Sequence, residues 1–124
     1  MDWYASCSYE PHRKRRFHSA ARTRLRHLAA LLGSSPASFD LRSNKAGIAV
    51  SGEITLHHER VYIQVSQPAT RDDSGILIRT CEGRRDYTGG RNHFAPLSML
   101  DDLEALAHLV RTIMTSKSGM IRAA

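Results

Sequence analysis

Cysteine, lysine and aromatic residues are scarce in this 124-residue sequence, and long hydrophobic runs are absent. Arginine, histidine or aspartate interrupts every apolar stretch well before the roughly eighteen residues that a transmembrane helix needs. The N-terminus carries Asp2 where a secretory signal would carry base. Cys7 and Cys81 are expected to be reduced thiols, with a disulfide as the alternative. These absences predict a cytoplasmic protein with no membrane partner.

Motifs that would indicate an enzyme are also missing. The sequence has no Gly-x-Ser-x-Gly, Walker loop or dinucleotide-binding fingerprint. His57 and His58 are neighbours whose side chains diverge in an extended segment, so they do not form a zinc-ligand pair. A metal site built from Cys81, His93 and a distant histidine, in a small metal-dependent enzyme, is the lesser alternative. We therefore predict a non-catalytic protein without a cofactor or metal.

Positively charged residues outnumber negatively charged ones in this sequence. The formal net charge is +6 and the sequence pI is about 9.9, which favours a nucleic acid or the acidic face of a nucleoprotein complex as partner. Arginine supplies nearly all of the positive charge and binds phosphate through its planar fork. Arginine enrichment from GC-rich coding is the competing explanation.

Hydrophobic periodicity predicts one α+β domain in two layers over residues 12–114. A flexible arm is expected at 1–11 and a frayed basic tail at 115–124. The first helix, 12–32, shows apolar residues at spacings of three and four and should end at Gly33. The second helix should start at a capping box formed by Ser98 and Asp101 and reach about Met114.

Between the helices, alternation predicts an antiparallel meander of three to four strands. A short extended segment at 39–42 is followed by a turn and then by a strand that starts at Ile48. A hairpin at 57–60 leads to a strand at 61–66, and a loop at 67–75 precedes the strand 76–81. The domain order is therefore α-β-β-β-α, and six side chains should form its core: Leu28, Ile54, Ile63, Ile78, Leu106 and Val110.

The long glycine-containing loop between Glu82 and Pro96 is the least generic segment of the chain, and loops of this length are usually functional. The guanidinium groups of its arginines suit the recognition of an anion, and its aromatic and imidazole rings suit stacking on a base. The alternative is that Gly89 and Gly90 form an ordinary turn and that Tyr87 and Phe94 pack into the core beside the second helix. The binding candidates are Arg84, Arg85, Tyr87, Arg91, Asn92, His93 and Phe94.

The start of the first helix is the second binding candidate. Arg13, Lys14, Arg15 and Arg16 are opposed by little acid, and a basic helix face can lie along a phosphate backbone. A solvated helix face is the alternative. We expect the helix to supply general attraction and the loop to supply specificity. A position of both basic elements on one side of the domain would favour binding over a solvated helix face.

The order of elements resembles that of the double-stranded RNA-binding domain, although Ser98 to Asp102 replaces the lysine-rich start of that family's final helix. The segment 47–94, especially Arg85 to Phe94, is similar to small uncharacterised accessory proteins of proteobacterial plasmids and integrative elements. That group includes anti-CRISPR inhibitors, so the resemblance implies inhibition of a bacterial defence complex. Action on the element's own DNA or RNA is the alternative. An uncovered sheet face or edge leaves a homodimer open.

Overall fold

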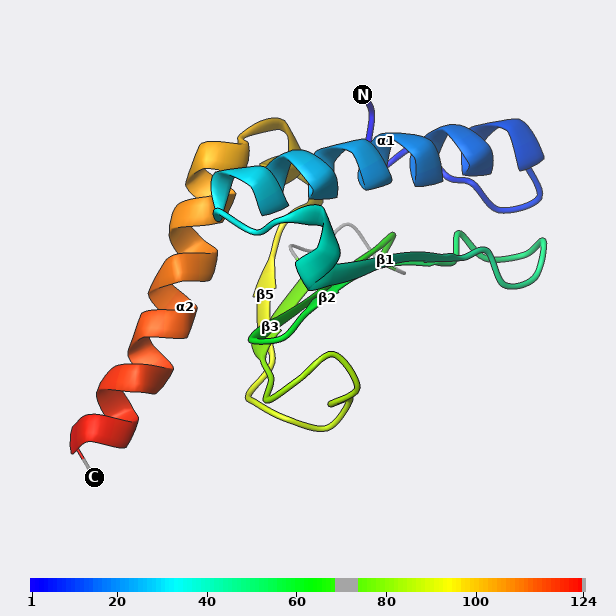
Figure 1. The fold of residues 1–124 in the computed structure, drawn as a ribbon. Coiled ribbons are helices and arrows are strands. Elements are labelled where there is room, and N and C mark those ends of the chain that lie inside the picture. The colour runs from blue at the N-terminus through cyan, green and yellow to red at the C-terminus, as the bar shows by residue number, and fades with distance from the viewer. Residues whose placement is uncertain (69–73, 124) are drawn as a thin grey trace.

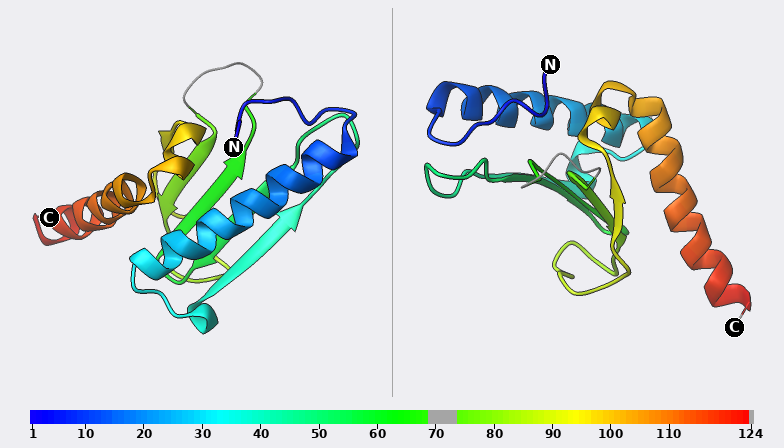
Figure 2. Two further views of the ribbon diagram at one scale, coloured as in Figure 1. Left: turned by 90° about the horizontal axis from the view of Figure 1, so that it is seen from above. Right: turned by 180° about the vertical axis from the view of Figure 1, so that it is seen from behind.

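The computed structural model describes residues 1–68 and 74–123, with backbone only for 117–123. Within these residues a five-stranded antiparallel sheet has the strand order β1-β2-β3-β4-β5. α1 (Pro11–Leu31) lies across one face of the sheet, and α2 (Leu103–Ala123) packs against α1 and β4 (Figures 1 and 2). The predicted α+β class and element order are confirmed, with five strands where three to four were expected.

The sheet is a meander in which each strand pairs with the next one in the chain. β5 lies inside the segment that was expected to be a loop from 82 to 96, and its three residues are too short to show an alternation. Part of the loop expected at 67–75 lies outside the described residues. The strands are β1 (Phe39–Asn44), β2 (Glu53–His58), β3 (Val61–Ser66), β4 (Ile76–Thr80) and β5 (His93–Ala95).

The core lies between α1, α2 and the inner face of the sheet. Alternate residues of β2, β3 and β4 point toward the helices, as Ile54 and Val65 do at one paired position. All six predicted core residues have an exposed fraction of 0%. The assignment of alternate strand residues to the buried and the outer face of the sheet is therefore confirmed for the central strands.

α1 begins and ends at residues whose backbone suits a helix terminus. Pro11 occupies the first turn, where its missing N–H costs no hydrogen bond. At the other end Gly33 has a φ of +76°, and its N–H donates to Ala30 O at 3.0 Å while the Ser34 N–H donates to Ala29 O at 2.9 Å. These two bonds form a Schellman motif, which confirms the predicted stop at Gly33.

The segment from Ile48 to Gly52 is a loop, so the start predicted for this strand at Ile48 is wrong, and β2 begins at Glu53 instead. Ile48 and Val50 are 61% and 49% exposed. Gly52 has a φ of +74°, which is not an extended conformation, so β2 begins only after it. A Cβ at this position would lie 2.2 Å from Asn44 O. The Tyr9 N–H donates to Ile48 O at 2.8 Å and ties this loop to the N-terminal segment.

The start of α2 is capped by Asp102. Its Oδ1 accepts the Ala105 N–H at 3.2 Å, whereas Ser98 lies in a preceding 3-10 turn, η2 (Leu97–Asp101). The predicted capping box of Ser98 and Asp101 is therefore wrong. The backbone of α2 continues to Ala123, so helix replaces the frayed tail expected after Met114. Among the described residues, no helix combines the length and apolar character that a membrane span requires.

The N-terminal segment packs into the core, although it was expected to be a flexible arm. Trp3 and Cys7 are each 2% exposed, and the Trp3 ring meets the edge of Phe17 at a centroid distance of 6.2 Å. Gln67 Nε2 donates to the carbonyls of Trp3 and Ala5 at 3.1 and 2.7 Å. A segment without periodicity is thus held by its buried indole and by side-chain hydrogen bonds.

Candidate nucleic-acid interface

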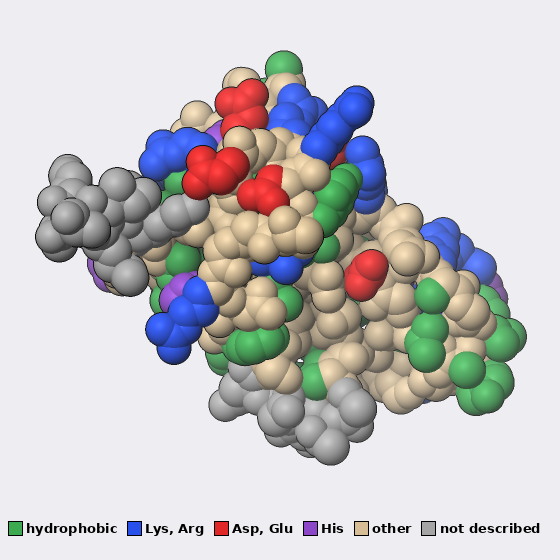
Figure 3. All heavy atoms as spheres, turned by 90° about the horizontal axis from the view of Figure 1, so that it is seen from below, with side chains coloured by type: hydrophobic (Ala, Val, Ile, Leu, Met, Phe, Trp, Pro, Cys, Tyr) green, Lys and Arg blue, Asp and Glu red, His purple; other side chains and the backbone are tan. Residues whose placement is uncertain are grey.

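The face of the sheet turned away from the helices carries polar and aromatic side chains. Because side chains alternate along a strand, the residues out of phase with the core lie there. Figure 3 views the molecule from this side and shows acidic, basic and hydrophobic side chains interspersed rather than segregated. We define the open face by these residues: Asp40, Arg42, Thr55, His57, Tyr62, Gln64, Leu77, Arg79 and Phe94.

A cluster of rings occupies one end of the open face. The His57 ring lies between those of Tyr62 and Tyr87, with edge-on contacts at centroid distances of 5.1 Å to each. The guanidinium of Arg79 lies 4.6 Å from the centroid of Tyr62, a cation-π contact. Burial lowers the pKa of His57, against the opposing effects of a hydrogen bond with the Gly83 backbone and of nearby carboxylates. Burial beneath the loop that follows β4 therefore favours the neutral form of the imidazole.

The β4–β5 loop (residues 81–92) is organised by one carboxylate. Asp86 accepts the backbone N–H groups of Glu82, Thr88 and Gly89 at 2.9, 3.1 and 2.9 Å. These bonds, that of Glu82 first, hold the pKa of Asp86 below its usual value. Gly90 has a φ of +73°, and a Cβ there would lie 2.3 Å from Thr80 O. The loop is thus a built structure whose glycine is required by close backbone approach.

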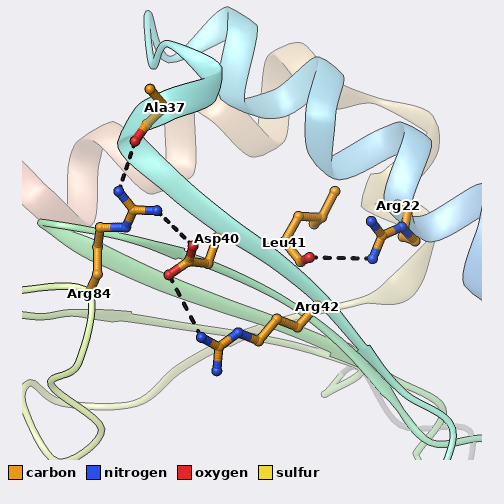
Figure 4. Close-up of polar contacts among 6 residues, drawn as sticks. All are labelled: Arg22, Ala37, Asp40, Leu41, Arg42 and Arg84. Atoms are coloured by element: carbon orange, nitrogen blue, oxygen red, sulfur yellow. Dashed lines mark hydrogen bonds and ion pairs between the residues drawn. The ribbon is translucent and has the colours of Figure 1, made fainter.

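Arg84 fastens this loop to the edge of the sheet (Figure 4). Its guanidinium donates to Ala37 O at 2.8 Å and to Asp40 Oδ1 at 2.7 Å, and Arg42 lies 3.9 Å from the other oxygen of Asp40. The bond from Arg84 is the main reason that the pKa of Asp40 is lowered. Arg84 was expected to bind a ligand anion, but its fork is already occupied by protein acceptors.

The other predicted loop residues divide between the two faces of the sheet. Arg85, Arg91 and Asn92 are exposed, and no described residue bonds to their side chains. Phe94 is 54% exposed on the open face, opposite Leu77. His93 pairs with Ile78, so it lies half-buried on the helix side. Tyr87, in contact with His57, and Phe94, opposite Leu77, therefore lie on the side of the sheet turned away from the helices, whereas His93 does not.

The basic start of α1 lies on the opposite layer from the β4–β5 loop, above the sheet in Figure 1 while the loop lies below it. Arg13, Arg15 and Arg16 are exposed. Lys14 is only 7% exposed, and its Nζ donates to Gly47 O at 2.8 Å. Lys14 is therefore a buried structural donor. The helix and the loop do not lie on one side of the domain, which is the arrangement that would have favoured binding by the helix.

Sequence patterns alone did not single out Tyr62 and Arg79, which form part of the open face. A usable signal existed, because both residues alternate with core positions in strands whose parity was assigned correctly. What the sequence lacked was the fact that helices cover only one face of the sheet.

Neither thiol belongs to a metal-ligand cluster. No group of three or more His, Cys, Asp or Glu side chains suited to a metal ion occurs among the described residues. Cys81 Sγ donates to His58 O at 3.2 Å, and burial raises the pKa of Cys7. Both cysteines are buried thiols.

Comparisons with known proteins give a partial match to one ribosomal protein. The chain is similar to large ribosomal subunit protein uL5 of Streptococcus pyogenes, in serotype M5 (strain Manfredo) and serotype M49 (strain NZ131) alike. The identity is 32% over 90 residues, which cover 66% of this chain and 48% of the relative. The chain thus spans about half the length of the curated relatives it matches. No family model and no solved structure matches it.

Proposed function

We propose that this chain is a non-catalytic RNA-binding domain that holds single-stranded RNA on the open face and the β4–β5 loop. The observation that carries the proposal is Phe94, a large ring 54% exposed on the face of the sheet that α1 and α2 do not cover. Bases stack on exposed aromatic side chains of such sheets, and every base offers a π-face for this contact. Tyr87, 51% exposed, supplies a second ring at the same side of the sheet.

Charge supports the same ligand. Arg85 and Arg91 are exposed in the β4–β5 loop, where their guanidinium groups can bind phosphates, and the net charge of +6 favours approach of a polyanion. Two acids on this side of the sheet are already engaged by the protein, since Asp86 accepts backbone N–H groups of the loop and Asp40 pairs with Arg84. The partial similarity to a protein of the large ribosomal subunit, an RNA-protein assembly, favours RNA over DNA.

Binding of a labelled single-stranded RNA, followed by fluorescence anisotropy, tests this proposal. Phe94→Ala is expected to weaken binding about 5- to 150-fold, because one stacked base contributes on the order of 1–3 kcal/mol. Ile48→Ala is the matched control, since it removes an exposed apolar side chain from the β1–β2 loop. Equal affinity of the Phe94→Ala variant and the wild type would refute the proposed surface. The same sequence as single-stranded DNA tests the preference for RNA.

Inhibition of a bacterial defence complex, which the resemblance to mobile-element proteins implied, stays a prediction. The relatives found are ribosomal and carry no information on it. Copurification of the tagged chain with a defence nucleoprotein, and inhibition of that complex by the purified chain, would support it.

A further inference from the structure

A separate cavity lies on the helix side of the sheet, where α1 ends. It has a volume of about 520 Å³ and is bounded by the residues that follow α1, the β2–β3 turn and α2. This volume falls within the range of small-molecule sites, roughly 300–1,000 Å³.

The lining of this cavity is cationic and rich in hydroxyl groups. Arg60 comes from the β2–β3 turn and Arg111 from α2, and no carboxylate occurs among the described residues that line it. Within the described part of the chain, neither arginine pairs with an acid. The hydroxyl groups belong to Ser34, Ser35, Ser38 and Thr115.

The C-terminal carbonyls of α1 would repel an anion if they were unbonded. All four of the last carbonyls are bonded, and the Leu31 carbonyl accepts from Arg111. This contact fixes Arg111 at the wall of the cavity and leaves most of its five N–H donors for a ligand. The other three carbonyls, of Leu28, Ala29 and Ala30, accept from the N–H groups of Leu32, Ser34 and Gly33 respectively.

His58 adds a neutral donor to the same lining. The Arg60 N–H donates to His58 Nδ1 at 3.1 Å, so the proton of the neutral imidazole resides on Nε2. Burial lowers the pKa of His58, which favours this neutral form. An acceptor-rich group is thus offered guanidinium, imidazole and hydroxyl donors from three different elements.

We propose that this cavity binds a small phosphate monoester through Arg60 and Arg111. Guanidinium forks match the oxygens of phosphate, and donors arriving from several directions suit a tetrahedral anion. The side chains of Leu32, Val61 and Met114 line the cavity as well and give the organic part of the ester an apolar wall. The inference does not rest on the proposed RNA site, which lies on the other face of the sheet.

Backbone amide shifts of the full chain in NMR titrations with adenosine 5′-monophosphate, inorganic phosphate and adenosine test the proposal. The monophosphate is expected to shift amides of residues 33–38, 58–61 and 111–115 with a Kd of about 1 mM or below. Adenosine, which lacks the anion, should bind at least about tenfold more weakly. No shift with either phosphate, or equal binding of adenosine, would overturn the proposal.

Two charge-removing variants separate this site from the RNA site. Arg60→Gln changes an exposed side chain with no bonded partner among the described residues, and should weaken monophosphate binding about tenfold or more. Arg91→Gln removes the same charge from the β4–β5 loop and should leave monophosphate binding unchanged while weakening RNA binding. Unchanged monophosphate binding in the Arg60→Gln variant, or an equal loss in both variants, would overturn the assigned site.

Discussion

The arginine residues of this chain divide into those that hold the fold together and those that face solvent. Arg84 bridges the β4–β5 loop to Ala37 and Asp40, and Arg24 pairs with Asp101 at 3.4 Å. Arg85 and Arg91 make no bond to a described residue. Only the second group retains its full set of donors for a ligand.

Arg84→Ala is therefore expected to lower the thermal midpoint, because the loop loses its attachment to β1. Arg85→Ala, one position away and exposed, should leave the midpoint nearly unchanged, since exposed side chains usually contribute within about 0.5 kcal/mol. Thermal unfolding of the two variants, measured under one buffer condition, distinguishes them. Equal midpoints would show that the Arg84 contacts do not stabilise the native state.

His57 makes stability depend on pH. Its pKa is lowered in the folded state, chiefly by burial, so the unfolded chain binds a proton more readily. The stabilisation is present above the unfolded pKa of about 6.5 and is lost as the pH falls through the lower folded value. Asp40 and Asp86 face this ring and raise its pKa, while Arg42 lowers it.

The thermal midpoint should accordingly fall between pH 7 and pH 5, a window set by the reference histidine pKa. His57→Phe keeps a ring between Tyr62 and Tyr87 and should reduce the decline. His18 and His58, whose pKa values burial also lowers, maintain part of it. A decline of the same size in the His57→Phe variant would assign the effect to those other histidines.

At the scale of elements, the shape of the β4–β5 loop depends on Gly90. Gly90→Ala should destabilise the protein by about 1–3 kcal/mol and weaken RNA binding, because a Cβ is strained at this φ and would collide with Thr80 O. Gly83→Ala is the matched control, since no atom lies within 4 Å of the Cβ position there. Denaturant unfolding of both variants measures the difference, and equal stability would contradict the account of the loop.

The elements predicted best from sequence are those in which a regular spacing of apolar residues extends over many positions. Phe17, Leu25 and Leu28 mark α1, and their burial is complete or nearly so. The same residue types misled at Ile48 and Val50, because alternation does not show whether a face has anything to pack against. β5 and the Asp102 cap depend on only a few residues, and local patterns that short are ambiguous.

The candidate site could be predicted only in part, because the partners of charged side chains are distant in sequence. Arg84 meets Asp40 across 44 positions, and Lys14 meets Gly47 across 33. The composition of the loop marked it as unusual, but only the fold shows which of its arginines are hydrogen-bonded to other parts of the protein. The layer on which each basic element lies was equally invisible to sequence patterns.

At the scale of the whole molecule, the two basic surfaces lie on opposite layers, so one short RNA strand should contact only one of them. Arg85→Gln with Arg91→Gln should reduce the slope of log affinity against log salt by about 1.4, at roughly 0.7 per lost phosphate contact. The triple change Arg13→Gln, Arg15→Gln and Arg16→Gln should leave the slope unchanged. A loss of slope confined to the triple variant would place the RNA on α1.

The most direct test of the central claim is to map a short single-stranded RNA onto the chain by NMR amide shifts. The shifted amides are expected to belong to β4, β5 and the β4–β5 loop, with Leu77, Tyr87, Arg91 and Phe94 among them. The amides of residues 12–16 should not move. Shifts confined to α1, or no shift at RNA concentrations that saturate binding by anisotropy, would contradict an RNA site on the open face.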